Sequence, residues 1–163
     1  MTSSRFVHAC IAAATLALGG CSGYSPMSLP AGTSATDIRA HMGPPTASYA
    51  RGDAGRRLEY AKGPFGAHTF MVDLDKDDRL VRSQQVLTRA HFAEVRVGMT
   101  RDELLYRIGH PAETAPLPRQ KHDLWSYRFD SAPFCLWFQV SLDVTGRVVD
   151  TGYAPDPLCT PIE

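Results

Sequence analysis

Along the chain, hydrophobic residues with helical spacing are followed twice by runs of aromatic and β-branched residues. The clearest helix is predicted after Thr100, because Thr100 and Glu103 form a capping box and apolar residues then share one side up to Gly109. A counterpart is predicted after Ser34, and Thr88 is a candidate cap for a further short helix. The pattern thus predicts helical segments at the start of two similar stretches of chain.

Strand patterns follow each helical segment. They are separated by turn residues and are expected at residues 57–61, 68–75, 79–86, 124–129, 134–143 and 147–153. Helices followed by runs of strands predict an α+β architecture. We expect each unit to have three antiparallel strands, with helices packed on one face of the sheet.

The chain contains an internal duplication. Three pairs of residues are separated by 66 positions, namely Gly32 and Gly98, Gly43 and Gly109, and Pro45 and Pro111. Four later pairs are separated by 68 positions, namely Phe70 and Phe138, Leu74 and Leu142, Asp75 and Asp143, and Arg79 and Arg147. Matched residues in a fixed order indicate a repeated structural unit. We expect the first repeat at residues 32–87 and the second, with a C-terminal tail, at residues 88–163.

The first twenty residues have the pattern of an export signal. Arg5 precedes an apolar run over residues 9–18, which is too short to cross a bilayer. Residues 18–21 (LGGC) resemble the lipobox of bacterial lipoproteins, which implies cleavage after residue 20 and lipidation of Cys21. An ordinary signal peptide with a chance cysteine is the alternative. By resemblance to lipoprotein sorting signals, Ser22 implies the outer membrane, with the body facing the periplasm and residues 21–31 as a lipidated tether.

Composition excludes some function classes. Removing residues 1–20 leaves 16 basic and 17 acidic residues, without a basic run, so nucleic-acid binding is not expected. The aspartates at 73, 75 and 77 imitate a calcium loop, but Asp78 and Gln84 occupy the positions that require Gly and Glu. Motifs typical of hydrolases or nucleotide-binding enzymes do not occur in the sequence. We therefore expect neither a metal, nor a cofactor, nor enzymatic activity.

Two cysteines remain in the predicted mature chain besides Cys21. In an oxidising periplasm Cys135 and Cys159 are expected to form a disulfide. The alternative, a redox-active thiol, lacks the C-x-x-C spacing.

The second repeat carries a motif that resembles a known family. Residues 97–104 (VGMTRDEL), 108–111 (IGHP) and 125–127 (WSY), followed by a hairpin with Asp143 and Arg147, resemble the SmpA/OmlA (BamE-like) outer-membrane lipoprotein domain. The tandem arrangement is similar to that of the β-lactamase inhibitor protein family. The first resemblance implies a periplasmic accessory role in outer-membrane protein assembly, and the second implies an enzyme-gripping concave sheet.

Strand alternation indicates a candidate binding face. Along residues 134–143, Trp137 and Gln139 are expected to face away from the helices, and Met71 is expected on the same face of the first repeat. A large apolar side chain such as Trp137 is typical of protein-binding sites. The alternative is that Trp137 packs against the other repeat or against the C-terminal tail.

These observations lead to two main functional hypotheses. The first is an outer-membrane lipoprotein that acts as a scaffold or accessory factor, with the β-barrel assembly machinery or another periplasmic protein as partner. The second is an inhibitor-like module that binds an enzyme on its concave sheet face.

Overall fold

The computed structural model describes residues 24–158. The predicted signal peptide, Cys21 and Cys159 lie outside this range. The elements begin with a 3₁₀ turn, η1 (Pro26–Ser28), and the helices are α1 (Ala35–Met42), α2 (Arg89–Phe92) and α3 (Arg101–Ile108). Among the described residues, the helices are all too short or too polar to span a membrane.

Helices α1 and α3 begin and end where the sequence predicts, whereas α2 ends before Val95. Thr100 caps α3, its hydroxyl accepts the N–H of Glu103, and the Glu103 carboxylate accepts the N–H of Thr100, which completes the capping box. Ser34 caps α1 in the same position, and Gly43 ends that helix with a φ of 77°. Thr88 caps α2, which is a single turn.

The strands form two separate antiparallel sheets of four strands each. Sheet 1 has the order β1 (Ala47–Ala50), β2 (Arg56–Ala61), β3 (Thr69–Leu74) and β4 (Leu80–Gln85). Sheet 2 has the order β5 (Glu113–Leu117), β6 (His122–Arg128), β7 (Leu136–Leu142) and β8 (Val148–Pro155). The expectation of three strands per unit is wrong. The additional strands, β1 and β5, are short edge strands rich in Ala, Glu or Pro, which have low strand propensity.

The duplication of the sequence is a duplication of structure. Helices α1 and α3 start 66 positions apart, as do strands β1 and β5, which is the first spacing found in the sequence. Strands β4 and β8 start 68 positions apart, which is the second spacing. The separation changes in the connection before β7. Two similar units therefore follow each other along the chain.

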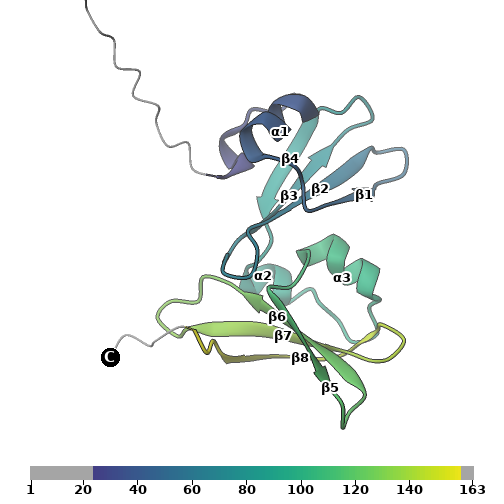
Figure 1. Ribbon diagram of the computed structural model, residues 1–163. Coiled ribbons are helices and arrows are strands. Elements are labelled where there is room, and N and C mark those ends of the chain that lie inside the picture. The colour runs from purple at the N-terminus through teal and green to yellow at the C-terminus, as the bar shows by residue number, and fades with distance from the viewer. Residues whose placement is uncertain (1–23, 159–163) are drawn as a thin grey trace, which may run out of the picture.

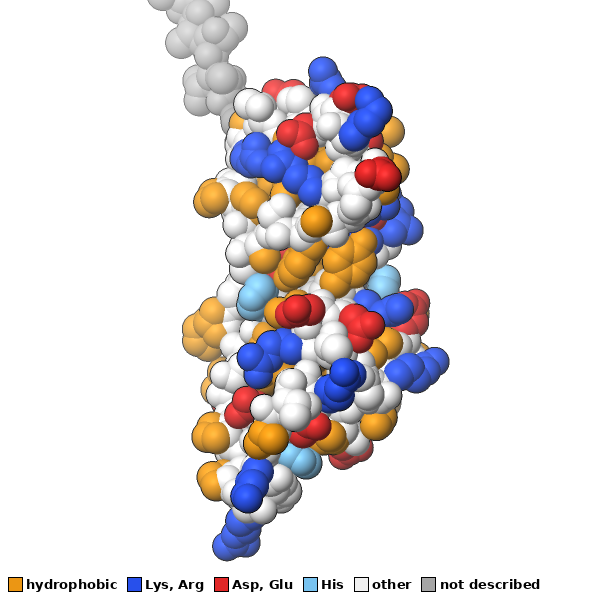
Figure 2. Space-filling view, turned by 90° about the vertical axis from the view of Figure 1, so that its right-hand side faces the viewer, with side chains coloured by type: hydrophobic (Ala, Val, Ile, Leu, Met, Phe, Trp, Pro, Cys, Tyr) orange, Lys and Arg blue, Asp and Glu red, His pale blue; other side chains and the backbone are white. Residues whose placement is uncertain are grey.

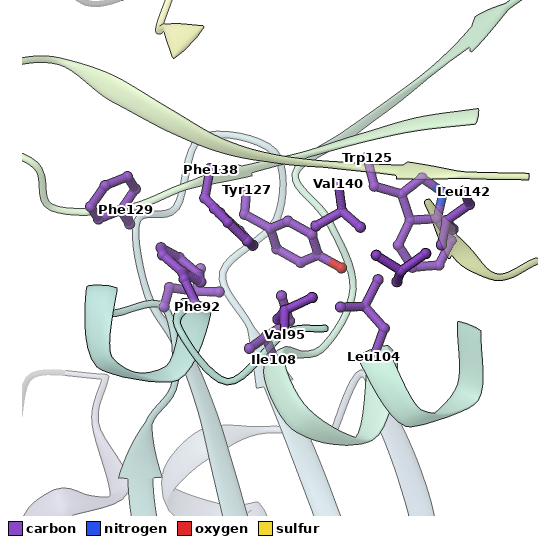
Figure 3. Close-up of a cluster of buried hydrophobic side chains, with 12 residues drawn as sticks. Phe92, Val95, Leu104, Ile108, Trp125, Tyr127, Phe129, Phe138, Val140 and Leu142 are labelled. Atoms are coloured by element: carbon purple, nitrogen blue, oxygen red, sulfur yellow. The ribbon is translucent and has the colours of Figure 1, made fainter. Parts of the chain in front are cut away.

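Each unit has its own hydrophobic core between a helix and a sheet. In the first, α1 contributes Ala35, Ile38 and Met42 to a cluster with buried side chains of β2, β3 and β4. In the second, Leu104 and Ile108 of α3 point toward aromatic and branched side chains of sheet 2 (Figure 3). Helices α2 and α3 lie between the two sheets (Figure 1). The layers are thus α1, sheet 1, the α2–α3 layer and sheet 2.

Part of the segment expected to be a tether is folded. Tyr24 and Leu29 pack against the core of the first unit, and Pro26 is buried. The Ser83 hydroxyl of β4 donates to the carbonyl of Pro26 at 3.2 Å. The prolines of this segment therefore fix a turn on the edge of sheet 1.

Candidate functional site

The predicted partner-binding residues are not an exposed apolar face. Trp137 is 4% exposed and Met71 is fully buried, whereas the half-buried Gln139 donates to the hydroxyl of Ser126 at 3.0 Å. Met71 lies opposite Glu59 in the sheet and shares its face, which the second unit covers. The expectation that Met71 and Trp137 provide accessible apolar anchors is therefore wrong.

The first contact between the units is built around a buried carboxylate. Glu59 of β2 is fully buried, and its Oε1 accepts the backbone N–H of His110 at 2.8 Å. His110 Nδ1 lies 3.0 Å from both carboxylate oxygens, and the hydroxyl of Tyr49 donates to Oε2 at 2.5 Å. Burial, reinforced by the hydrogen bond to Glu59, raises the pKa of Tyr49. The site is a polar joint between sheet 1 and the end of α3.

The second contact between the units is made by Arg57, which binds residues of both units. Arg57 makes a two-pronged ion pair with Asp73, with Nε to Oδ1 at 2.7 Å and Nη2 to Oδ2 at 3.0 Å. Its Nη1 donates to the carbonyl of Tyr106 at 2.9 Å, and its guanidinium carbon lies 4.2 Å from the centre of that ring. Burial alone raises the pKa of Asp73, but the hydrogen bonds and charge of Arg57 outweigh it, so this pKa lies below its ordinary value. Arg57 therefore links β2 to α3.

Hydrophobic side chains gather at the level of this junction on the face shown in Figure 2, with histidines on either side. Charged side chains of both signs predominate above and below it. Arg57 and Glu59 alternate with Leu58 and Tyr60 along β2, so strand alternation places their charges on a solvent-facing side and does not reveal such a joint. The available signal is the pair of opposite charges on one face of this strand.

The aspartates that imitate a calcium loop hold turns. Asp75 Oδ1 accepts the N–H groups of Asp77 and Arg79, each at 2.9 Å. Asp143 repeats this arrangement in the second unit, with N–H groups of Thr145 and Arg147 at 2.8 and 3.0 Å. Across residues 24–158, no group of three or more metal-ligating side chains is brought together.

A largely apolar surface cavity lies where three segments meet. We call it the interunit groove; its volume is about 550 Å³, and it lies between the β2–β3 loop of the first unit, the β6–β7 loop of the second, and the chain after β8. Its lining is Phe65, Ala67, His68, Arg128, Phe129, Asp130, Ser131, Ala132, Pro133, Cys135, Leu136, Asp156 and Leu158. Two large apolar side chains of this lining stay exposed, Phe65 at 78% and Leu158 at 67%.

Arg128 joins the three walls of the groove. Its Nε donates to Asp156 at 2.6 Å, its Nη1 donates to the carbonyl of Pro64, and its guanidinium carbon lies 4.7 Å from the Trp137 ring. Burial raises the pKa of Asp156, but the hydrogen bonds from Arg128 dominate and lower it. Trp137 is thus part of the support beneath the groove, beside the C-terminal segment.

Cys135 lies in the wall of the groove that the β6–β7 loop forms, and it is disulfide-bonded. Cys159, its predicted partner, lies outside the described residues, so the pairing stays a prediction. It would join the last described residues of the chain to the β6–β7 loop.

Comparison with known proteins leaves the family open. No family model matches the sequence, and no curated protein sequence matches it. Among solved structures, a Streptococcus mutans protein provisionally described as a β-lactamase inhibitor protein has 11% identity, with 75% of this chain and 82% of that chain covered, and a TM-score of 0.34.

Two further solved structures are similar to the same degree. A DUF4309 family protein of Bacillus subtilis has 13% identity over 76% of this chain and 79% of that chain, with a TM-score of 0.31. An extracellular protein of Bacillus anthracis that contains an SCP domain has 13% identity over 77% of this chain and 44% of that chain, with a TM-score of 0.30. Likeness at this level is too distant to carry an argument about function.

Proposed function

We propose that this protein is an outer-membrane lipoprotein that binds another envelope protein through the interunit groove. The observation that carries the proposal is that the exposed side chains of Phe65 and Leu158 line one cavity. Exposed aromatic side chains beside a cavity are typical of protein-binding sites, where they supply most of the binding free energy.

The groove is a better candidate than the face of sheet 1 that carries Met71. The face of sheet 1 that carries Glu59 and Arg57 is covered by the second unit. Sheets 1 and 2 are separate, with no strand pairing between them in the described part of the chain. A continuous concave sheet, which an inhibitor of the second hypothesis would use, is therefore not supported by the arrangement of the units.

We place the protein among accessory factors of envelope assembly. The lipobox-like residues around Cys21 support a membrane anchor, and the motif around Thr100 and Gly109 supports a likeness to the SmpA/OmlA (BamE-like) domain. The partner is an envelope protein that presents apolar side chains to the groove. The β-barrel assembly machinery is the leading candidate.

Affinity capture tests this proposal. The tagged, lipidated protein is captured from mildly solubilised envelopes, and the proteins that accompany it are identified by mass spectrometry. A Phe65→Ser/Leu158→Ser double variant is compared with Val144→Ser, which changes a similarly exposed apolar residue (80%) on the β7–β8 hairpin.

Each outcome has a distinct meaning. Enrichment of β-barrel assembly proteins that is lost only in the double variant supports the proposal in full. Enrichment of one soluble periplasmic enzyme instead favours the inhibitor-like hypothesis. Capture that is unchanged in the double variant shows that the groove is not the binding site.

A further inference from the structure

The outer edge of β8 carries unpaired backbone groups. Asp156 donates its N–H to the carbonyl of Cys135 at 2.8 Å, which fixes the pairing pattern between β7 and β8. Hydrogen-bonded pairs alternate with non-bonded pairs in an antiparallel ladder, so Ala154 and Gly152 also point their backbone groups toward β7. Thr151 and Tyr153, between them, point theirs away from the sheet. Within residues 24–158, the backbone groups of these two residues have no hydrogen-bond partner outside the ladder.

The other three sheet edges are protected. β1 has only four residues, and β5 contains Pro116, which lacks an N–H. β4 is covered by the folded N-terminal segment, because Ser83 donates to Pro26 and Leu80 exchanges hydrogen bonds with Gly32 and Thr33.

On the outer edge of β8, hydrogen bonds from a neighbouring segment of the described chain cover only the first residue, Val148. Val148 exchanges hydrogen bonds with Gly98 and Met99 in the same way as Leu80 does in the first unit. Beyond it, the strand has one charged residue, Asp150, and no proline before its last position. An edge of this length without lysine or an internal proline pairs readily with another strand.

We propose that β8 pairs with β8 of a second copy of this chain, antiparallel and centred on Gly152. In this register Thr151 exchanges both backbone hydrogen bonds with Tyr153 of the second copy, and the reverse pair does the same. A β-branched residue opposite an aromatic one is a favourable cross-strand pair, and Tyr153 is 45% exposed in the single chain.

Side chains on the other face fit this register as well. Gly152 lies opposite itself, which lets the two strands approach without a side-chain clash. Asp150 lies opposite Ala154 of the second copy, so like charges do not meet directly. The strand is therefore self-complementary in both charge and size.

The resulting geometry also suits proteins on one membrane. A two-fold axis normal to the sheet joins the two sheets into one and keeps both first units on the side where α2 and α3 lie (Figure 1). The described chain starts in the first unit, at Tyr24. Both copies thus direct their N-terminal ends toward the same side. This inference does not depend on what the interunit groove binds.

Disulfide trapping on the lipidated full chain tests the pairing. A Cβ at Gly152 meets no atom within 4 Å, so a cysteine fits there. In the proposed register the two Cα atoms of residue 152 are about 4.5 Å apart, within the range that a disulfide spans. Gly152→Cys is compared with Gln84→Cys, the same position on β4. We expect a linked dimer on mild oxidation in membranes from Gly152→Cys and none from Gln84→Cys.

Sedimentation equilibrium in a density-matched detergent provides the second readout. The unmodified protein should have twice the mass of one chain, and two variants should have the mass of one. Thr151→Pro removes an outward N–H without breaking the ladder to β7, and Gly152→Lys places two like charges opposite each other. Circular dichroism confirms that both are folded.

The remaining outcomes overturn the proposal. A protein that stays monomeric and does not link through residue 152 has no β8 pairing. A dimer that persists in both Thr151→Pro and Gly152→Lys uses another surface. A Gly152→Cys adduct to a different protein assigns the edge to a foreign strand instead of a second copy.

Discussion

The carboxylate of Glu59, in the first unit, accepts the backbone N–H of His110, in the second unit, at 2.8 Å. Glu59 is fully buried, so this hydrogen bond and the one from Tyr49 replace the water that the charge loses on folding. The units are therefore joined by a specific polar contact. The interunit groove also takes its walls from both units.

Removing the buried carboxylate should destabilise the whole protein. Glu59→Ala leaves the N–H of His110 and the hydroxyl of Tyr49 without their acceptor, which should cost about 2–4 kcal/mol of unfolding free energy. Glu94→Ala is the control, because its ion pair with Arg107 is exposed and should contribute less than about 1 kcal/mol. Urea unfolding measures both. A loss below about 1 kcal/mol for Glu59→Ala would show that the joint is dispensable.

Gly109 of the second unit lies close to residues of the first unit, so alanine at this position tests the packing of the units as well as local backbone strain. Gly109 and Gly43 end equivalent helices with φ of +78° and +77° and ψ of −167° and −168°, so alanine is strained by about 1–3 kcal/mol at either position. A Cβ at Gly109 also lies 2.9 Å from Glu59 Cδ and from Thr69 Cγ2, whereas at Gly43 nothing lies within 4 Å. Thermal unfolding should therefore show a larger loss for Gly109→Ala than for Gly43→Ala. Equal losses would mean that the units are not packed together in solution.

Acid should weaken the protein partly through Asp73. The pKa of this carboxyl is lower in the folded protein than its ordinary value of 3.8, because of its hydrogen bonds to Arg57. Its contribution to stability is thus fully present above about pH 3.8 and is lost as the pH falls through the lower, folded value. The stability advantage of the unmodified protein over Asp73→Asn should shrink across that acid range. An advantage that is independent of pH would refute the pairing, and exposed Asp77→Asn is the control.

The predicted partner of Cys135 can be identified chemically. Peptide mapping without reduction should yield a fragment in which Cys135 is linked to Cys159. Reduction should then lower the unfolding free energy by about 3 kcal/mol, the value expected for a loop of about 25 residues. A fragment that links Cys135 to any other cysteine would contradict the assignment.

Local signals in the sequence predict much of each unit. The capping box of Thr100 and Glu103, and the glycines that end α1 and α3, predict both helices because caps depend on neighbouring residues alone. The repeated spacings predict two units of the same kind. β1 and β5 escape detection because edge strands need few apolar residues.

The arrangement of the units could not be predicted in this way. Met71 and Trp137 lie on the sheet faces that alternation predicts, but alternation does not tell what covers a face. The cover on sheet 1 is the end of α3, held by Arg57 and Glu59 from positions distant in sequence. The groove likewise combines loops from different repeats, far apart along the chain, so neither loop alone indicates it.

Site-specific photocrosslinking in intact cells tests groove binding most directly. A photoreactive residue replaces Phe65, which lines the groove, or Val144, which is similarly exposed on the β7–β8 hairpin. The account predicts one discrete protein adduct from position 65 and none from position 144. Absence of an adduct at position 65, or the same adduct at both positions, would contradict the assignment of the interunit groove as the partner-binding site.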